Sequence, residues 1–382
     1  ALGSDFAIGV KEDGTVWSWG SGSKGELGMG KKENREVPQA IPNMTDFVEV
    51  AAGSGHVLAL RKDGTVWSWG YGMLGLGKFE SRDTPQAIPN MTDFVEVAAG
   101  SDHVLALRKD GTVWSWGDNE KGALGYKEDG LPYGEPPNIR FSPHQLTPKQ
   151  IPDLKDVVSI AAGVNSSYAV DKEGKIWGWG TGSYLMGNVS ENEAKIVTTP
   201  TIVYEENKVS IIRTSGSEVM LILENGKALI YAADVWNAWQ TSGAKKRLLV
   251  KTPYIVSIDN IVDILKTGNT YLVLRADGTV WVYGMNLGGV LGQCDFKNNF
   301  YQDFVQVKNL KNIIAIYSYI AIDEEGYVWR WGKSIYPSIL YGLKPTANQY
   351  GHESCPIKVG RIKDFAFFAS SFTGEIFFAN TK

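Results

Sequence analysis

Glycines at phosphate-binding spacing are the first residues in this chain whose type could support chemistry. Residues 20–25 (GSGSKG) and 70–75 (GYGMLG) both have the G-x-G-x-x-G spacing of a dinucleotide-binding loop. That chemistry needs a helix directly after the loop, because the helix N-terminus holds the pyrophosphate. Here each glycine run follows a β-rich segment, and no helical pattern comes after it. The spacing therefore indicates a turn, and we expect no cofactor.

Histidines and carboxylates could supply acid–base catalysis. His56 and His103 stand at the same repeat position, which Phe6 and Ser166 occupy in other units. A catalytic histidine is not expected in two copies and absent elsewhere, so we expect a structural role. Acidic residues such as Asp63 precede a turn glycine instead of forming pairs, and motifs such as H-E-x-x-H and G-x-S-x-G are missing. We predict that the chain is not an enzyme and binds no metal.

Two cysteines complete the set of reactive side chains. Cys294 and Cys355 are the only cysteines, and neither lies in a C-x-x-C pair. This pattern predicts no disulfide framework and leaves the redox compartment open.

The elements that must position these residues are repeats. Residues 38–70 and 85–117 are the same 33-residue sequence and differ only at Gly55 and Asp102. The final turn of that sequence, DGTVWSWG, recurs in varied form along the chain, and we count eight hairpins separated by 47 to 63 residues. A period in this range indicates a solenoid or a propeller, in which each unit packs on its neighbours.

Each unit has the pattern of four strands. HVLALR and TVWSWG are rich in β-branched and aromatic residues, and the Asp-Gly between them suits a tight hairpin. An apolar run such as FVEVAAG precedes them, and a fourth strand begins near a proline, as in TPQAI. Tryptophan pairs in the VWSWG strand share one face, where stacked units would bury them. Four strands are the content of one propeller blade.

The combined pattern AAG-x-x-H-x-x-AL-x-x-DG-x-V-x-x-WG, followed by G-x-LG as at residues 25–28 and 122–125, resembles the regulator of chromosome condensation repeat. The sequence DGTVWSWG looks like that of bacterial members of this family. The resemblance implies an all-β propeller, usually of seven blades. Because eight hairpins are present, we favour eight blades, with seven as the alternative. We expect one domain over residues 1–382.

Composition limits the partners. The net charge of -4 argues against a basic nucleic-acid-binding face, so we expect no nucleic acid. No apolar run is long enough to span a membrane, so we expect no membrane insertion. A mature secreted chain would look the same as this one. We expect an extracellular or cell-surface location, with a cytoplasmic location as the alternative.

The sequence therefore predicts a rigid disc with variable loops. We expect partner contacts where the sequences of the repeat units differ from one another. The first such place is the loop between the AAG strand and the HVLAL strand, where Gly55 and Asp102 differ. The expected partner-binding residues at this position are Asp5, Gly55, Asp102, Asn165, Ser217, Asn269 and Tyr317.

Two further places break the repeat. The long connection at residues 118–147 contains Tyr126, Tyr133 and Phe141 among several prolines, and we predict that it binds the partner. In the fifth unit, Trp236 and Trp239 are the only tryptophans outside the repeat position. Aromatic anchors are enriched at interface hot spots, so we add this pair to the expected contacts.

Three functions compete. We favour a non-catalytic propeller that binds another protein, of a bacterial secreted or surface type. The founding member of the resembled family is a guanine-nucleotide exchange factor for a small GTPase, which gives the first alternative. A bacterial propeller with similar repeats inhibits β-lactamase, which gives the second alternative. That inhibitor carries aromatic residues in the loops that are mostly small, polar or acidic here, and this difference suggests a basic partner.

Overall fold

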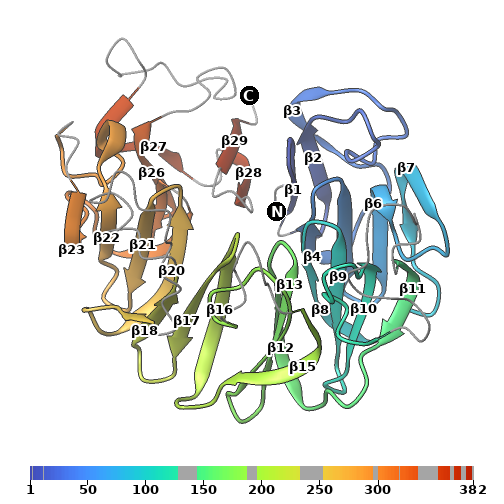
Figure 1. Cartoon of the computed structure of the whole chain (residues 1–382). Coiled ribbons are helices and arrows are strands. Elements are labelled where there is room, and N and C mark those ends of the chain that lie inside the picture. Colours follow the sequence, from blue (N-terminus) through green and yellow to red (C-terminus); the bar gives the residue numbers. More distant parts are fainter. Residues whose placement is uncertain are drawn as a thin grey trace, which may run out of the picture.

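The chain forms an all-β propeller of seven blades arranged in a ring (Figure 1). This computed structural model describes residues 1, 3–11, 13–127, 144–186, 196–232, 253–295, 300–317, 319–333, 352–361, 365–370 and 376–380. Within them, the 3₁₀ turn η1 (Leu287–Gly289) is the single helical element.

Six blades are four-stranded antiparallel sheets in which sequence order is spatial order, and the first blade has three strands. The first three blades comprise β1 (Phe6–Val10), β2 (Val16–Gly20) and β3 (Arg35–Ala40); β4 (Phe47–Ala52), β5 (His56–Arg61), β6 (Val66–Met73) and β7 (Phe79–Ala87); and β8 (Phe94–Ala99), β9 (His103–Arg108), β10 (Val113–Asp118) and β11 (His144–Gln150).

The next two blades comprise β12 (Val157–Ala162), β13 (Ser166–Asp171), β14 (Ile176–Gly180) and β15 (Val197–Tyr204); and β16 (Val209–Ser215), β17 (Glu218–Leu223), β18 (Ala228–Tyr231) and β19 (Tyr254–Ile255). The last two comprise β20 (Ile261–Thr267), β21 (Thr270–Arg275), β22 (Val280–Met285) and β23 (Phe300–Gln306); and β24 (Ile313–Tyr317), β25 (Ile320–Asp323), β26 (Tyr327–Lys333) and β27 (His352–Arg361).

The hairpin between the second and third strands is fixed by its Asp-Gly pair. In the second blade, the Asp63 carboxylate accepts hydrogen bonds from the Thr65 amide at 3.0 Å and from the Thr65 hydroxyl at 2.7 Å. Gly64 has φ of 82°, a conformation that residues with a side chain rarely adopt. The equivalent glycines of the other blades also have positive φ: Gly14, Gly111, Gly174, Gly226, Gly278 and Gly326. The hairpin prediction is confirmed at all seven, and Gly374 lies outside the described residues.

The core lies between blades. Each hydrophobic cluster joins the strands of two neighbouring blades; one contains Phe6 and Ile8 of the first blade with Val57 and Trp69 of the second. A propeller blade presents two apolar faces, and stacking covers both of them. The sequence period therefore becomes a ring of repeated interfaces.

The G-x-LG segments of the first, third and sixth blades each bond to the next blade. Leu27 is buried between the first two blades, and its carbonyl accepts the Ser18 hydroxyl at 2.6 Å. One residue earlier, the Glu26 carbonyl accepts the Trp69 indole N–H of the second blade at 2.8 Å. Trp179 and Trp331 make the same type of bond, to the carbonyls of Ala123 at 2.7 Å and Val290 at 2.9 Å.

The eighth hairpin does not build an eighth four-stranded blade. On either side of it, β28 (Phe365–Ser370) and β29 (Ile376–Asn380) form a separate two-stranded sheet. This sheet lies at the seam of the ring, with β28 beside β1 (Figure 1). Ala1 and Gly3 already bond to β1 there, on its inner side. The ring therefore has seven blades, the alternative to the eight that we favoured.

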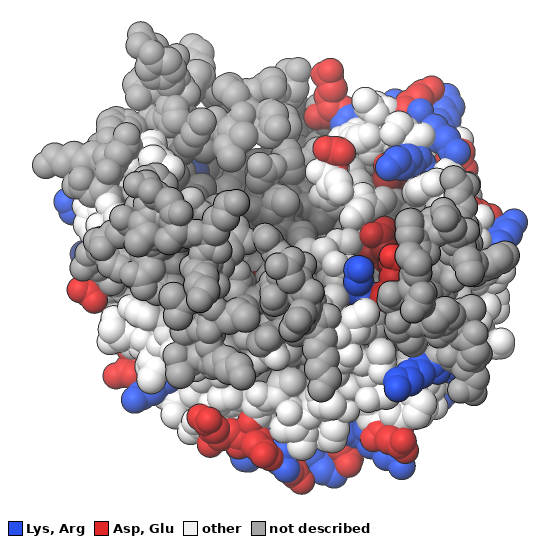
Figure 2. Space-filling view, viewed as in Figure 1, with Lys and Arg blue, Asp and Glu red and all other residues white. Residues whose placement is uncertain are grey.

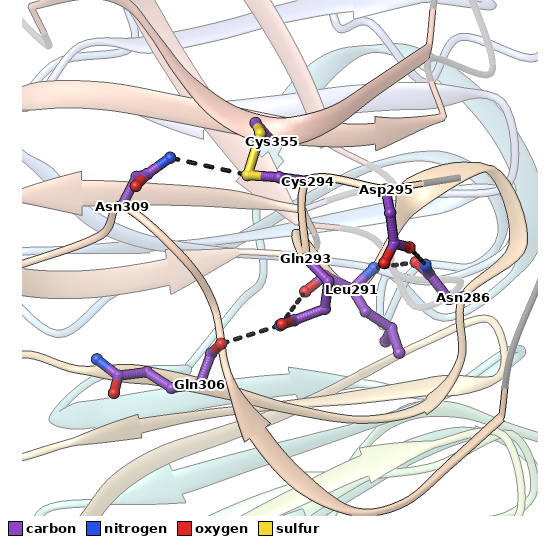
Figure 3. The surroundings of a disulfide bond; sticks show 8 residues. All are labelled: Asn286, Leu291, Gln293, Cys294, Asp295, Gln306, Asn309 and Cys355. Carbon is purple, nitrogen blue, oxygen red and sulfur yellow. Dashed lines mark hydrogen bonds between the residues drawn. A yellow bond between two sulfur atoms is a disulfide. The ribbon is translucent and has the colours of Figure 1, made fainter. Parts of the chain in front are cut away.

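The cysteines differ from the sequence prediction. Cys294 and Cys355 form a disulfide between the loop after β22 and strand β27 (Figure 3). The prediction of no disulfide was wrong because the partners are 61 residues apart in sequence and meet only when the sixth and seventh blades stack.

Candidate functional site

Strand topology brings the variable loops to one face of the ring. In antiparallel blades, the loop between the first and second strands and the loop between the third and fourth strands leave from the same end. The Asp-Gly hairpins leave from the opposite end. We call the first end the loop face and the second the hairpin face. The variable position before the second strand therefore lies on the loop face in every blade.

In five blades, the backbone at this variable position makes the same hydrogen bond. The carbonyl of Gly55 accepts the Tyr71 amide at 2.8 Å, and the carbonyl of Asp102 accepts the Asp118 amide at 2.8 Å. The carbonyls of Asp5, Asn165 and Asn269 accept the amides of Ser21, Thr181 and Met285. The bond uses main-chain atoms only, so it places no demand on the side chain.

The glycine that ends each VWSWG strand is required by the same contact. A Cβ atom on Gly70 would lie 2.4 Å from the Gly55 carbonyl oxygen, and one on Gly117 would lie 2.4 Å from that of Asp102. Gly20 has the same relation to Asp5, at 2.6 Å. These close approaches explain the phosphate-like glycine runs as packing against a neighbouring loop.

Neighbouring loops also bond to each other. The Ser54 amide donates to the Ser101 carbonyl at 3.0 Å, and the Ser101 amide donates to the Val164 carbonyl at 3.3 Å. The loops of the second, third and fourth blades therefore form one continuous backbone collar around the ring centre.

Side chains at the variable position differ in exposure. Asp5, Asp102 and Asn269 are exposed, and Asn165 and Ser217 are half-buried. Gly55 is buried, with the backbone and ring of Tyr71 nearest to it, so Gly55 offers no contact surface of its own.

Two expected partner contacts lie elsewhere than predicted. Tyr126 is only 3 % exposed within the core between the third and fourth blades, so it is not on a protruding loop. It comes directly after the G-x-LG segment of residues 122–125, whose Leu124 is buried in the same cluster. Tyr317 is the last residue of β24, paired with Ile320, because the inner connection of the seventh blade is shortened to residues 318–319. Tyr133, Phe141, Trp236 and Trp239 lie outside the described residues.

An exposed aromatic pair on the loop face was missed by the sequence analysis. Tyr71 is 42 % exposed and Phe79 is 51 % exposed, and their rings meet edge to face at 5.0 Å between centroids. The Lys24 ammonium of the first blade lies 5.4 Å from the Tyr71 ring centroid. The signal in the sequence is that Tyr71 replaces the Ser21 and Asp118 of neighbouring units directly after Trp-Gly.

Asp102 has one acidic neighbour and two basic ones. Burial, followed by the nearby Asp118 carboxylate, raises the pKa of Asp102 above its ordinary value. The His144 Nδ1 atom lies 3.4 Å from the Asp118 Oδ1 atom. The charges of His144 and Lys24 act to lower the pKa of Asp102. In the described part of this view, acidic and basic side chains are interspersed (Figure 2).

The inner strands carry a second group of carboxylates. Glu49 accepts the Val97 amide of the next blade at 3.3 Å, and Glu96 accepts the Ile160 amide at 3.3 Å. Burial, and then the charge of Glu96, raises the pKa of Glu49 to about 7. Burial also raises the pKa of Glu96. Each carboxylate bridges two blades, so these groups are part of the packing of the ring.

The two repeat histidines are buried. Burial lowers the pKa of His56 to about 4 and that of His103 to about 3, so both are neutral at physiological pH. The His103 Nε2 atom lies 2.9 Å from the Ser167 hydroxyl of the next blade. This placement agrees with a structural role.

Two other features are absent from the described residues. Nowhere in the described ranges do three histidine, cysteine or acidic side chains come together as metal ligands. Among the same residues, no helix is long and apolar enough to cross a membrane.

Comparisons with known proteins agree with this architecture. The family model for the regulator of chromosome condensation (RCC1) repeat matches residues 13–60, 63–107 and 110–170, and a second RCC1 repeat model matches residues 94–123. Protein pim1 of Schizosaccharomyces pombe is 29 % identical over 167 residues, which are 39 % of this chain and 31 % of pim1. The chain thus spans about a third of the length of that relative.

Solved propellers share the fold over most of the chain. Prp20p from Saccharomyces cerevisiae, described by its binding to Gsp1p and histones, has a TM-score of 0.67 at 21 % identity, covering 96 % of this chain and 88 % of its own. Human WBSCR16 has a TM-score of 0.67 at 20 % identity, covering 90 % and 93 %. The matches to the RCC1 repeat thus lie within residues 13–170, and the similarity to solved structures shows a β-propeller fold over most of the chain.

Proposed function

We propose that this chain is a non-catalytic propeller that binds another protein through its loop face. The proposal rests on one observation: at the position before the second strand, five of the seven blades make the same backbone hydrogen bond while the side chain varies. A residue with a fixed carbonyl and a free side chain can change without cost to the fold, which suits a surface selected for binding.

The charge of this face favours a basic partner. Asp5 and Asp102 are exposed, and the ionised form of Asp102 is disfavoured by burial and by Asp118. A lysine or arginine of a partner would offset this unfavourable charge and gain a charge-assisted hydrogen bond. The similar propeller Prp20p is described as binding histones, which are basic proteins.

The exposed aromatic pair adds an apolar anchor. Tyr71 and Phe79 lie where β6 leads into β7, at the loop-face end of the second blade. Aromatic side chains on a rigid scaffold lose little conformational entropy on binding and are frequent hot spots. We therefore include both residues in the binding surface.

Two alternatives remain as proposals. Nucleotide exchange on a small GTPase is supported by the structural similarity to Prp20p, which is described as binding Gsp1p. Inhibition of a β-lactamase is supported by the family resemblance and by the Tyr71–Phe79 pair. Accelerated nucleotide release from a GTPase panel, or loss of β-lactamase activity on mixing, would favour the corresponding alternative over a generic binder.

The location is part of the same proposal. We propose a bacterial secreted or cell-surface protein, with a cytoplasmic one as the alternative. The Cys294–Cys355 bond supports the former, because disulfides persist in oxidising compartments.

The test uses a charge reversal on the loop face. A pull-down with the purified propeller, followed by mass spectrometry, supplies a partner. Replacing Asp5, Asp102 and Asn165 together by Lys should then weaken binding at least tenfold, or about 1.4 kcal/mol. The melting temperature should stay within about 2 °C of the parent, since surface changes usually alter stability little.

A matched control makes the same charge change on the hairpin face. Replacing Glu173, Glu224 and Thr45 by Lys alters three exposed residues there and should leave affinity within about twofold. Equal affinity for the loop-face variant and the parent would remove the proposed surface.

A further inference from the structure

Cys294 occupies a position that is glycine in the first two blades. The amides of Gly30 and Gly77 donate to outer-strand carbonyls of the next blade, those of Asp83 at 2.7 Å and Leu146 at 2.9 Å. The Cys294 amide makes the same bond to Ser354, at 2.9 Å. All three donors follow a Leu-Gly pair by two residues and have positive φ, of 72°, 87° and 61°. Glycine adopts that conformation readily and asparagine and aspartate do so less often, so a cysteine there is an exception.

The partner cysteine is also an exception at its position. A Cβ atom on Gly30 would lie 3.7 Å from the Thr84 methyl group, and one on Gly77 would lie 3.9 Å from that of Thr147. Both threonines come one residue after the carbonyl acceptor and directly before a proline, as does Cys355. A facing Gly–Thr pair is thus replaced by a Cys–Cys pair at the interface of the sixth and seventh blades.

The loop that carries Cys294 is held in place without the sulfur bond. The Gln293 side-chain amide donates to the carbonyls of Leu291 at 3.1 Å and Gln306 at 2.9 Å. The Asn286 amide oxygen accepts the Leu291 N–H at 3.0 Å. Figure 3 shows these bonds around the disulfide. The two cysteines therefore stay opposite each other after the bond is cut, so it can form again.

The bond is accessible from solvent on one side. Cys294 is exposed, whereas Cys355 is half-buried. Thiol–disulfide exchange needs an approach to one sulfur, and exposed disulfides are the more labile ones. Attack is therefore favoured at the Cys294 sulfur.

We propose that Cys294–Cys355 is a reversible thiol-exchange site that latches the sixth blade to the seventh. A small-molecule thiolate attacks Sγ of Cys294, the S–S bond breaks, and Cys355 leaves as a thiolate that takes a proton. A second thiolate then attacks the small-molecule sulfur of the mixed disulfide and releases Cys294. The cysteine pair is reduced by two electrons, and two small thiols are oxidised to one disulfide.

Stability in the presence and absence of reductant tests the latch. Dithiothreitol should lower the melting temperature of the parent by about 4 °C, as expected for opening a loop of this length in a chain of this size. The double variant Cys294→Gly with Cys355→Thr introduces the pair that Gly30 with Thr84 and Gly77 with Thr147 form. Its melting temperature should not respond to dithiothreitol. A parent that keeps its melting temperature after both thiols have been alkylated would overturn the latch.

Single variants test the site of attack. With oxidised glutathione, Cys355→Ser should form the mixed disulfide on Cys294 at least tenfold faster than Cys294→Ser forms it on Cys355, as followed by intact mass. Equal rates, or faster reaction at Cys355, would overturn the assignment of Cys294 as the attacked sulfur.

Discussion

The two tryptophans of the VWSWG strand differ in how deeply they are buried. Trp69 is fully buried between two blades and donates its indole N–H to Glu26 of the first blade. Trp67 is half-buried, with its ring edge to face against Phe47 at 5.9 Å and its N–H bonded to Thr65. We expect Trp69→Ala to lower the free energy of unfolding by about 3–5 kcal/mol, the range for a buried aromatic.

Trp67→Ala serves as the comparison. Because part of the Trp67 ring is already exposed to water, this substitution should lower the free energy of unfolding by less, about 1–3 kcal/mol. Urea unfolding followed by far-UV circular dichroism measures both. If Trp67→Ala were the more damaging of the two, the inter-blade indole bond would not be a main source of stability.

Glu49 should make stability depend on pH. Its pKa is raised from 4.5 to about 7, mainly by burial and then by Glu96. Between these values the unfolded chain ionises while the folded chain keeps the proton, so stability falls as pH rises through this window. Above about pH 7, Glu49 lowers the free energy of unfolding by its full amount, which is about 3 kcal/mol at most.

Glu49→Gln tests this pH dependence. The amide oxygen can still accept the Val97 N–H, so packing is kept. In the parent, ionisation of Glu49 lowers the free energy of unfolding between pH 5 and pH 8. In Glu49→Gln the change between these two pH values should be smaller by about 2–3 kcal/mol. Glu120→Gln changes an exposed carboxylate and controls for the loss of one charge. An unaltered difference in Glu49→Gln would show that this carboxyl group is ionised in the folded protein at both pH values.

At the scale of the element, a strand and a loop share one tight contact. The glycine that ends the third strand packs on the carbonyl before the second strand, and the same carbonyl accepts the next amide. This arrangement holds the loop-face backbone in one conformation in successive blades. It explains why the Trp-Gly pair recurs at the end of the third strand while the residue before the second strand changes from blade to blade.

Gly70→Ala should be strongly destabilising. Gly70 has φ of 95°, and an added Cβ would meet the Gly55 oxygen at 2.4 Å, so strain and a steric clash combine. We expect a loss of about 3 kcal/mol or more. Gly72 also has positive φ, 127°, but no atom lies within 4 Å of its added Cβ. Gly72→Ala should therefore lose less, about 1–2 kcal/mol, from strain alone. Thermal unfolding compares the pair, and equal losses would exclude the loop contact as the cause.

At the scale of the whole molecule, the ring is a series of equivalent interfaces. The facing pair Gly30 and Thr84 between the first two blades corresponds to Cys294 and Cys355 between the last two. A disulfide should therefore be transferable along the ring. Gly30→Cys with Thr84→Cys should form a second bond under oxidising conditions, since a Cβ atom on residue 30 would lie 3.7 Å from the Thr84 methyl group.

Peptide mass spectrometry without reductant checks this bond, and the melting temperature should rise by a few degrees when it forms. Gly30→Cys alone, which adds the strained residue without a partner, is the control. Two free thiols in the double variant would mean that the two interfaces differ in geometry.

The sequence by itself determined the repeat, its strands and its turns. Asp-Gly hairpins, alternating apolar strands and buried tryptophans are local patterns, and each depends on residues near in sequence. The same patterns placed Asp5, Asp102 and Asn165 in loops at one position of the repeat. The structure bears out the seven described hairpins and puts these residues on one face.

Only the tertiary structure decided the features that depend on stacking. Whether Tyr126 is buried, whether Cys294 meets Cys355, and whether the last hairpin forms a full blade all depend on neighbouring blades and on closure of the ring. A local pattern carries no distance between residues that are 61 positions apart. Aligning the units would have shown Cys294 over Gly30 and Cys355 over Thr84, but only the packed ring shows that those positions face each other.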